Sequence, residues 1–172
     1  MNGPYLLRPL ALVGMPGSGK TSVGRLLARR LALPFVDSDA AIEGETGEAI
    51  THLFAARGEA HFRRLERQTI DRLLGGAPLI LATGGGAMID ADMRPMLLTR
   101  ATTLWLDAPP DILAARLAGQ THRPLLAGPD LPARLGALAV HREPHYRLAH
   151  HRIAADADLD EVVTRILALI RP

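Results

Sequence analysis

A short apolar run that leads directly into a glycine-rich loop constrains this chain more than any other feature. Leu10–Val13 is continuously apolar, as expected of a strand buried on both faces, and the segment GMPGSGKT (14–21) follows at once. Thr21–Leu33 then has the periodicity of a helix. A strand, a G-x4-G-K-T loop and a helix in this order form the P-loop pattern, which predicts binding of a nucleoside triphosphate.

The residue types in this loop have physical reasons. Gly14, Gly17 and Gly19 allow a tight turn whose N–H groups form an anion nest, and the helix adds its positive end. Lys20 is the only lysine among the 20 lysines and arginines of the chain. A compact ammonium reaches between phosphate oxygens, whereas a guanidinium fork is larger and has a fixed donor geometry. Thr21 offers a hydroxyl to Mg²⁺. The alternative is a chance glycine-rich turn.

Length and composition limit the classes of function. The 172 residues suit one domain (1–172), and 48% hydrophobic content is typical of a globular protein. The lack of cysteine excludes disulfides, thiolate zinc sites and a cysteine nucleophile. A net charge of +2 and 3% aromatic residues give no reason to expect a nucleic-acid partner. The N-terminal apolar stretch is broken by Pro4 and Pro9 and makes a poor signal peptide, and no apolar run of about 18 residues could span a membrane. We therefore expect a cytoplasmic protein without membrane attachment.

Apolar runs alternate with helical patterns along the rest of the chain. Further strands are expected at Pro34–Val36, Leu79–Ala82, Thr102–Leu106 and His151–Ala154. Further helices are expected at Glu48–Ala56, Glu59–Leu74, Pro110–Leu117, Leu131–His141 and Asp158–Ile170. Asp158 and Glu161 have capping-box spacing at the start of the last helix. This rhythm predicts an α/β fold, a three-layer α/β/α sandwich with a five-stranded parallel sheet. The Pro- and Gly-rich segment 119–130 is expected to be a loop.

Other stretches carry residues typical of a chemical site, and each also has a simpler interpretation. Asp37-Ser-Asp39 follows the second expected strand, at the edge where ligands gather in open α/β sheets, but Ser38 or Asp39 could instead cap a helix. Arg63, in GEAHFRRLE (58–66), could be an exposed helix arginine. The glycines of ATGGG (82–86) could form a plain strand-ending turn. RPLL (123–126) and REPHY (142–146) complete the set.

Together with the P-loop, these stretches resemble the shikimate kinase family. The motifs D-x-D, G-E-x-x-F-R-x-x-E, T-G-G-G, R-P-L-L and R-x-P-x-Y occur in the family's order and spacing, from about residue 8 to residue 170. The P-loop alone is shared by many kinases, so the combination carries the specificity. The resemblance implies ATP-dependent phosphorylation of the 3-hydroxyl of shikimate, with Mg²⁺ as cofactor and a mobile lid over residues 119–130.

The resemblance also implies individual roles. Asp39 steers the attacking hydroxyl, while Lys20 and the lid residue Arg123 stabilise the transferring charge. Glu66 orients Arg63, which grips the substrate carboxylate together with Arg142. The implied substrate-binding residues are Asp39, Arg63, Gly84, Gly85, Gly86 and Arg142. The implied ATP-binding residues are Gly14, Gly17, Ser18, Gly19, Lys20, Thr21, Ser22, Arg116 and Arg123. The implied metal site consists of Thr21 and Asp37.

Two stretches depart from the family pattern. His145 stands before Tyr146 where the family usually has leucine, and AADADLD (154–160) lacks the loop that some relatives place near adenine. The resemblance therefore assigns no adenine contact to 154–160. The seven histidines show no metal-ligand spacing. Four of them cluster in the sequence, and we expect solvated or capping roles for these four: His141, His145, His150 and His151.

Two other functions stay open. One is another P-loop small-metabolite kinase, such as a gluconate or nucleotide kinase, although no base-reading pocket is evident. The other is a non-catalytic shikimate-binding sensor. Such modules usually carry a DNA-binding segment, and we expect none because the P-loop begins at residue 14. We expect a monomer.

Overall fold

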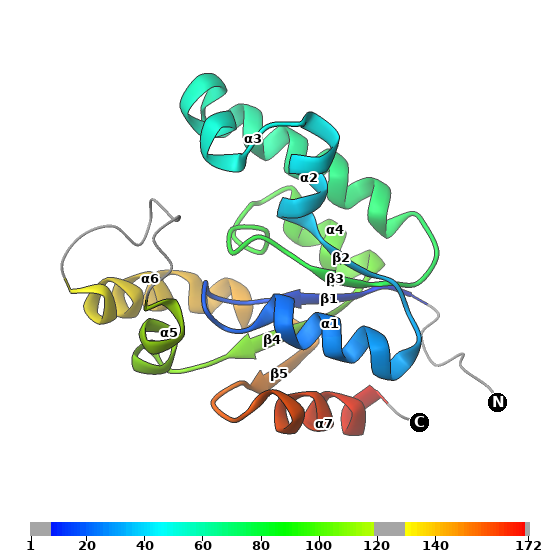
Figure 1. The fold of residues 1–172 in the computed structure, drawn as a ribbon, viewed down its shortest axis with the longest axis vertical. Coiled ribbons are helices and arrows are strands. Elements are labelled where there is room, and N and C mark those ends of the chain that lie inside the picture. Colours follow the sequence, from blue (N-terminus) through cyan, green and yellow to red (C-terminus); the bar gives the residue numbers. More distant parts are fainter. Residues whose placement is uncertain (1–7, 119–129, 171–172) are drawn as a thin grey trace.

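Residues 8–118 and 130–170 are described by a computed structural model (Figure 1). Within them, five parallel strands form one sheet in the order β2-β3-β1-β4-β5. The strands are β1 (Leu10–Val13), β2 (Phe35–Asp37), β3 (Ile80–Ala82), β4 (Thr102–Asp107) and β5 (His151–Ala154). The helices are α1 (Lys20–Leu31), α2 (Ser38–Thr46), α3 (Ile50–Leu74), α4 (Met93–Arg100), α5 (Pro110–Leu117), α6 (Leu131–Tyr146) and α7 (Leu159–Ile170).

Helices cover both faces of this sheet. In Figure 1, α1 and α7 lie on the near face, and α4 and the end of α6 lie behind it. The central strand β1 is buried along its whole length, as are all residues of β3. Because both faces are covered, these strands are apolar at successive positions and do not alternate with polar residues. The predicted three-layer α/β/α sandwich with a five-stranded parallel sheet is confirmed.

Helices α2 and α3 project beyond the β2 side of the sheet and pack on each other (Figure 1). Ile42, Leu53 and Phe62 form a small core of their own between them. Gly58 interrupts α3 with φ 77° and ψ 167°, in agreement with the predicted break between two helices near this residue. The second half of α3 therefore runs in a different direction from the first half, and it places Arg63 beside Gly86, which follows β3.

The sequence prediction missed α2 and α4 and ended α6 too early. Asp37 begins α2, since its side chain accepts hydrogen bonds from the N–H groups of Asp39 and Ala40. The capping role considered for Ser38 or Asp39 thus belongs to Asp37. Helix α6 was expected to end at His141, but it continues through Pro144 to Tyr146.

The start of α7 is partly as predicted. Asp158 Oδ1 accepts from Glu161 N at 2.9 Å, which confirms the cap. The carboxylate of Glu161 pairs with Arg165. The expected lid at 119–130, with Arg123, lies outside the described residues except for Asp130, which caps α6. Among the described helices, none combines the length and apolar character that a membrane span needs.

Candidate active site

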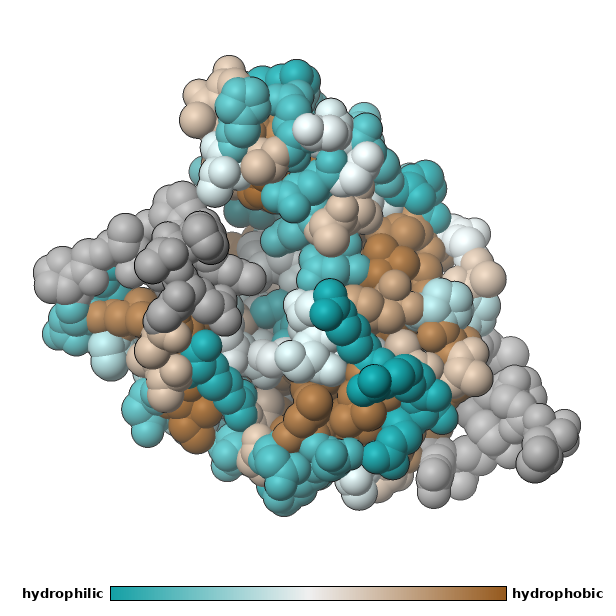
Figure 2. All heavy atoms as spheres, in the orientation of Figure 1, coloured by the Kyte–Doolittle hydropathy of each residue, from teal (hydrophilic) through white to brown (hydrophobic). Residues whose placement is uncertain are grey.

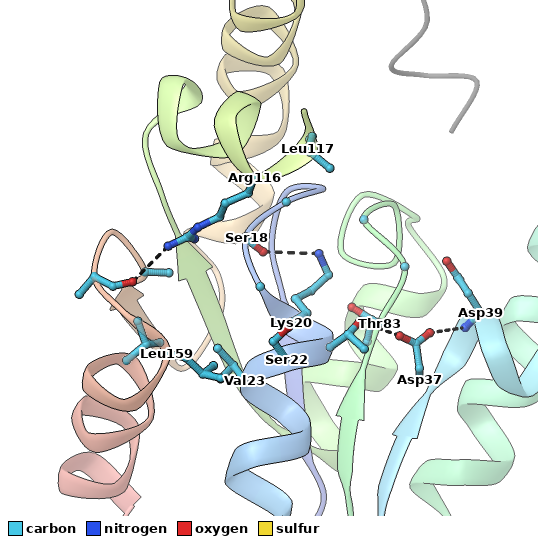
Figure 3. A pocket seen from close by; sticks show the side chains of 18 of the residues that line it. Ser18, Lys20, Ser22, Val23, Asp37, Asp39, Thr83, Arg116, Leu117 and Leu159 are labelled. Atoms are coloured by element: carbon cyan, nitrogen blue, oxygen red, sulfur yellow. Dashed lines mark hydrogen bonds between the residues drawn. The ribbon is translucent and has the colours of Figure 1, made fainter. Parts of the chain in front are cut away.

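A cavity of about 460 Å³ opens at the carboxyl ends of the strands (Figure 3). Its walls are the loop and helix start 17–23, the pair Asp37 and Asp39, the segment 83–85, Arg116 with Leu117, and residues around the start of α7. Figure 2 shows the surface hollowed beside the start of α1, below the projecting α2–α3 pair, much of which is covered by hydrophilic residues. Ligands of open α/β sheets bind at this edge.

The predicted P-loop lies between β1 and α1. Gly17 and Gly19 have φ values of 80° and 92°, in the left-handed region that favours glycine. Lys20 Nζ donates hydrogen bonds of 2.9 Å to the carbonyls of Gly14 and Met15. Gly14 lies at the base of the loop, where an added Cβ would be 2.6 Å from the carbonyl oxygen of Leu106. The loop is therefore packed closely against β4 beside the positive end of α1.

Thr21 of α1 and Asp37 of β2 bring a hydroxyl and a carboxylate together. Thr21 Oγ1 donates to Asp37 Oδ2 at 2.9 Å, while Asp37 Oδ1 caps α2. A hydroxyl and a carboxylate fit Mg²⁺, which prefers oxygen and retains water and phosphate ligands. Among the described residues, no group of three or more His, Cys, Asp or Glu side chains could hold a metal. A cation here would thus depend on nucleotide phosphates for further ligands.

The glycine run after β3 lies against carboxylates from α2 and α3. A Cβ added to Gly84 would be 2.6 Å from Glu66 Oε1 and 3.1 Å from Asp39 Oδ1. Gly84 N also donates to Ser38 Oγ at 3.1 Å. The absence of a side chain here lets two carboxylates approach the backbone at the edge of the cavity.

Two arginines approach the same run from different helices. A Cβ on Gly85 would be 3.0 Å from Arg142 Nη1, and one on Gly86 would be 2.7 Å from both terminal nitrogens of Arg63. Arg142 Nη1 also donates to the Gly85 carbonyl at 3.2 Å, and Tyr146 Oη donates to the same oxygen at 2.7 Å. The structure therefore gathers the predicted residues Asp39, Arg63 and Arg142 around one glycine loop.

Arg63 is held by two carboxylates. Its Nη1 donates to Glu66 Oε2 at 2.6 Å, and its Nη2 to Glu59 Oε1 at 3.3 Å. Burial raises the pKa of Glu66, Arg63 opposes this, and Asp39 and Asp90 add to the rise. Burial acts to lower the pKa of Arg63, but Glu66 and Glu59 outweigh it and raise that pKa. Arg63 therefore stays a cation in a fixed orientation.

The opposite end of the cavity is bounded by α5 and the start of α7. Arg116 Nη2 donates to the Ala157 carbonyl at 3.2 Å, and in Figure 3 Arg116 and Leu159 lie across the cavity from Asp37 and Asp39. The sequence assigned no contact to the lining residues Leu117, Ala155, Ala157, Asp158, Leu159 and Val162. Leu117 ends α5, which follows β4, and the other five residues follow β5. This place at the carboxyl ends of the strands, the same edge as the P-loop, is the one signal that could have found them.

A phosphate nest after the central strand, a sheet of order 2-3-1-4-5 and a second polar cluster at the same edge define a P-loop kinase of small molecules. Comparison with known proteins narrows this class. A sequence model of the shikimate kinase family matches residues 16–171. The shikimate kinase of Symbiobacterium thermophilum is 46% identical over 162 residues, which are 92% of this chain and 93% of the relative. The chain belongs to the shikimate kinase family.

Solved structures agree with this assignment. The shikimate kinase from Acinetobacter baumannii in complex with shikimate has a TM-score of 0.91 and 37% identity, covering 96% of this chain and 94% of that one. A gluconokinase from Sinorhizobium meliloti has a TM-score of 0.59 and 19% identity, over 95% and 91% of the two chains, and shares the fold alone.

Proposed function

We propose that this protein transfers the γ-phosphoryl group of ATP to the 3-hydroxyl of shikimate, giving shikimate 3-phosphate and ADP. The observation that carries the proposal is the placement of two different sites at one sheet edge. The P-loop suits phosphates, and the cluster of Asp39, Arg63 and Arg142 suits a hydroxylated carboxylate. Membership of the shikimate kinase family and the similarity to a relative in complex with shikimate support the choice of acceptor.

At the phosphate end, Ser18, Ser22 and the backbone of the P-loop would bind the triphosphate. Lys20 leaves the carbonyls of Gly14 and Met15 and places its charge between the β- and γ-phosphates. Arg116 covers the adenine side. Thr21 and Asp37 would hold Mg²⁺, which supplies neutralisation of phosphate charge when bound.

At the acceptor end, Arg63 and Arg142 bind the carboxylate with paired N–H donors. Asp39 orients the 3-hydroxyl toward the γ-phosphorus and accepts its proton as the new P–O bond forms. The glycine loop 84–86 lets the substrate ring approach the backbone. Arg123, outside the described residues, covers the phosphates in this proposal, and exclusion of water there would limit ATP hydrolysis.

The decisive experiment is ADP release from Mg²⁺-ATP with shikimate, gluconate, nucleoside monophosphates or no acceptor. Turnover that depends on shikimate alone is expected. Turnover with another acceptor instead would be consistent with the P-loop assignment, but it would refute the proposal that Arg63 and Arg142 bind the carboxylate of shikimate. Shikimate binding without any turnover would favour a sensor. We further propose a cytoplasmic monomer without nucleic-acid or membrane partners, which light scattering and cell fractionation test.

A further inference from the structure

One face of α6 is attached to the glycine loop. Arg142, His145 and Tyr146 stand at positions i, i+3 and i+4, so their side chains share a face of the helix. Arg142 and Tyr146 both donate to the carbonyl of Gly85, at 3.2 and 2.7 Å. This first attachment holds Gly85, the middle residue of the glycine loop 84–86, against the helix.

Arg94 of α4 makes a second attachment. Its Nη1 donates to the carbonyls of Met88 and Ile89, at 3.2 and 3.3 Å, and lies 3.0 Å from His145 Nδ1. A guanidinium has only donors, so Nδ1 must be the acceptor and carries no proton in this contact. One nitrogen of Arg94 therefore joins residues 88 and 89, just after the glycine loop 84–86, to the same face of α6.

Two attachments join the glycine loop to α6. The loop already has internal turn hydrogen bonds, since Ala87 N donates to the Gly84 carbonyl at 3.1 Å and Ile89 N donates to the Gly86 carbonyl at 2.9 Å. These bonds set the shape of the loop, but they do not set its position relative to α6. Arg142 contacts Gly85, and Arg94 connects residues 88 and 89 to His145, about one turn from Arg142 on α6, so the two attachments together fix that position.

We propose that Arg94 and His145 are positioning residues that act through Arg142. They keep α6 and the glycine loop at a fixed separation, so that the Arg142 guanidinium stays beside Gly85, where the acceptor carboxylate is bound. This inference rests on the proposed function, because it concerns the affinity for shikimate. The P-loop lies on other elements, so the affinity for ATP should not depend on the pair.

The test compares three variants of the full chain by steady-state kinetics. His145→Leu removes the acceptor and keeps apolar bulk, and His145→Gln offers an amide oxygen to Arg94. His141→Leu is the matched control, since His141 is exposed on the same helix about one turn earlier. We expect His145→Leu to raise KM for shikimate roughly three- to tenfold with KM for ATP unchanged. His145→Gln should recover most of this loss, and His141→Leu should match the wild type.

The outcomes separate this proposal from the proposed function. An active wild type with an unchanged KM for shikimate in His145→Leu overturns the positioning role. Equal rises in both KM values, or no recovery in His145→Gln, overturn it as well, because a general disturbance of the helix then explains the effect. A wild type that does not turn over shikimate refutes the proposed function itself. If His145→Leu does not fold, His145→Ala replaces it, since alanine is the strongest helix former.

Discussion

Arg63 donates a hydrogen bond of 2.6 Å to Glu66, a residue with no exposed surface. The other carboxylate oxygen of Glu66 is buried without a hydrogen-bond partner among the described residues and faces Gly84. The Arg63 side chain is itself only 25% exposed. A desolvated partner fixes the direction of the guanidinium fork, so Arg63 is not the exposed helix arginine that the sequence alone allowed.

Replacement of Arg63 by alanine should weaken binding of shikimate far more than binding of ATP. Loss of a charged, paired donor to a carboxylate is expected to raise Kd for shikimate by about 10- to 100-fold. Calorimetric titration with each ligand measures both constants. Arg64→Ala is the matched control, since Arg64 is the exposed neighbour on the same helix. Equal losses for the two ligands would contradict the assignment of Arg63.

Gly86→Ala should disturb the same guanidinium from the other side. The new methyl group would lie 2.7 Å from both terminal nitrogens of Arg63, so the fork must move away. We expect KM for shikimate to rise about tenfold, with little change for ATP. Gly44→Ala is the control, because nothing lies within 4 Å of its Cβ position. That helical substitution should raise stability by about 0.5–1 kcal/mol. An unchanged KM in Gly86→Ala would show that the crowding is relieved without consequence.

Lys20→Arg keeps the charge and should still abolish most turnover. The larger planar fork cannot occupy the position of a compact ammonium in the P-loop, and kcat should fall on the order of 10²- to 10³-fold. Arg29→Lys makes the reverse exchange at an exposed position of the same helix and should be neutral. Circular dichroism of both variants checks the fold. Near-normal kcat in Lys20→Arg would mean that charge alone suffices.

The contact between His150 and Thr103 predicts loss of stability in mild acid. Thr103 N donates to His150 Nδ1 at 3.0 Å, and the Thr103 hydroxyl lies 2.7 Å from the same nitrogen. Burial lowers the pKa of His150 below its ordinary 6.5, and Arg8 and His151 add to this. Between pH 6.5 and the lowered pKa, His150 of the unfolded chain binds a proton that His150 of the folded chain does not bind. The stabilisation is therefore complete above pH 6.5 and is lost as pH falls through the lowered pKa.

Urea unfolding at about pH 7.5 and about pH 5.5 measures this loss. His150→Asn is the comparison, because its amide oxygen can accept from Thr103 N and does not titrate. The decrease in unfolding free energy between the two pH values should be smaller in that variant. Identical decreases would assign the acid sensitivity to other groups.

The sequence predicted the elements whose signals are local. The apolar run of β1 and the spacing around Lys20 identify a strand, a phosphate loop and a helix without reference to the rest of the chain. Helix α2 has no such signal, since it buries only Ser38 and Ile42 and depends on the Asp37 cap. Helix α4 carries a proline near its start, and α6 continues past the predicted end at His141 with Pro144 inside it.

The candidate site could be predicted only in part from the sequence, and the reason is different. Arg142 and Gly85 are 57 positions apart, and the contact of His145 with Arg94 spans 51. No periodicity encodes which loop a given side chain will meet. The motifs identified the residue types of the site, but only the fold shows which of these residues contact one another.

The single lysine also makes the phosphate loop chemically distinguishable. All other cationic side chains apart from histidine are guanidiniums, so an acylating reagent has one side-chain amine to modify, Lys20 Nζ, besides the terminal amine. That nitrogen donates hydrogen bonds to the carbonyls of Gly14 and Met15, and Lys20 lines the cavity. The extent of acylation of the peptide that contains Lys20 therefore reports how much of the protein has nucleotide in its P-loop, with no engineered label.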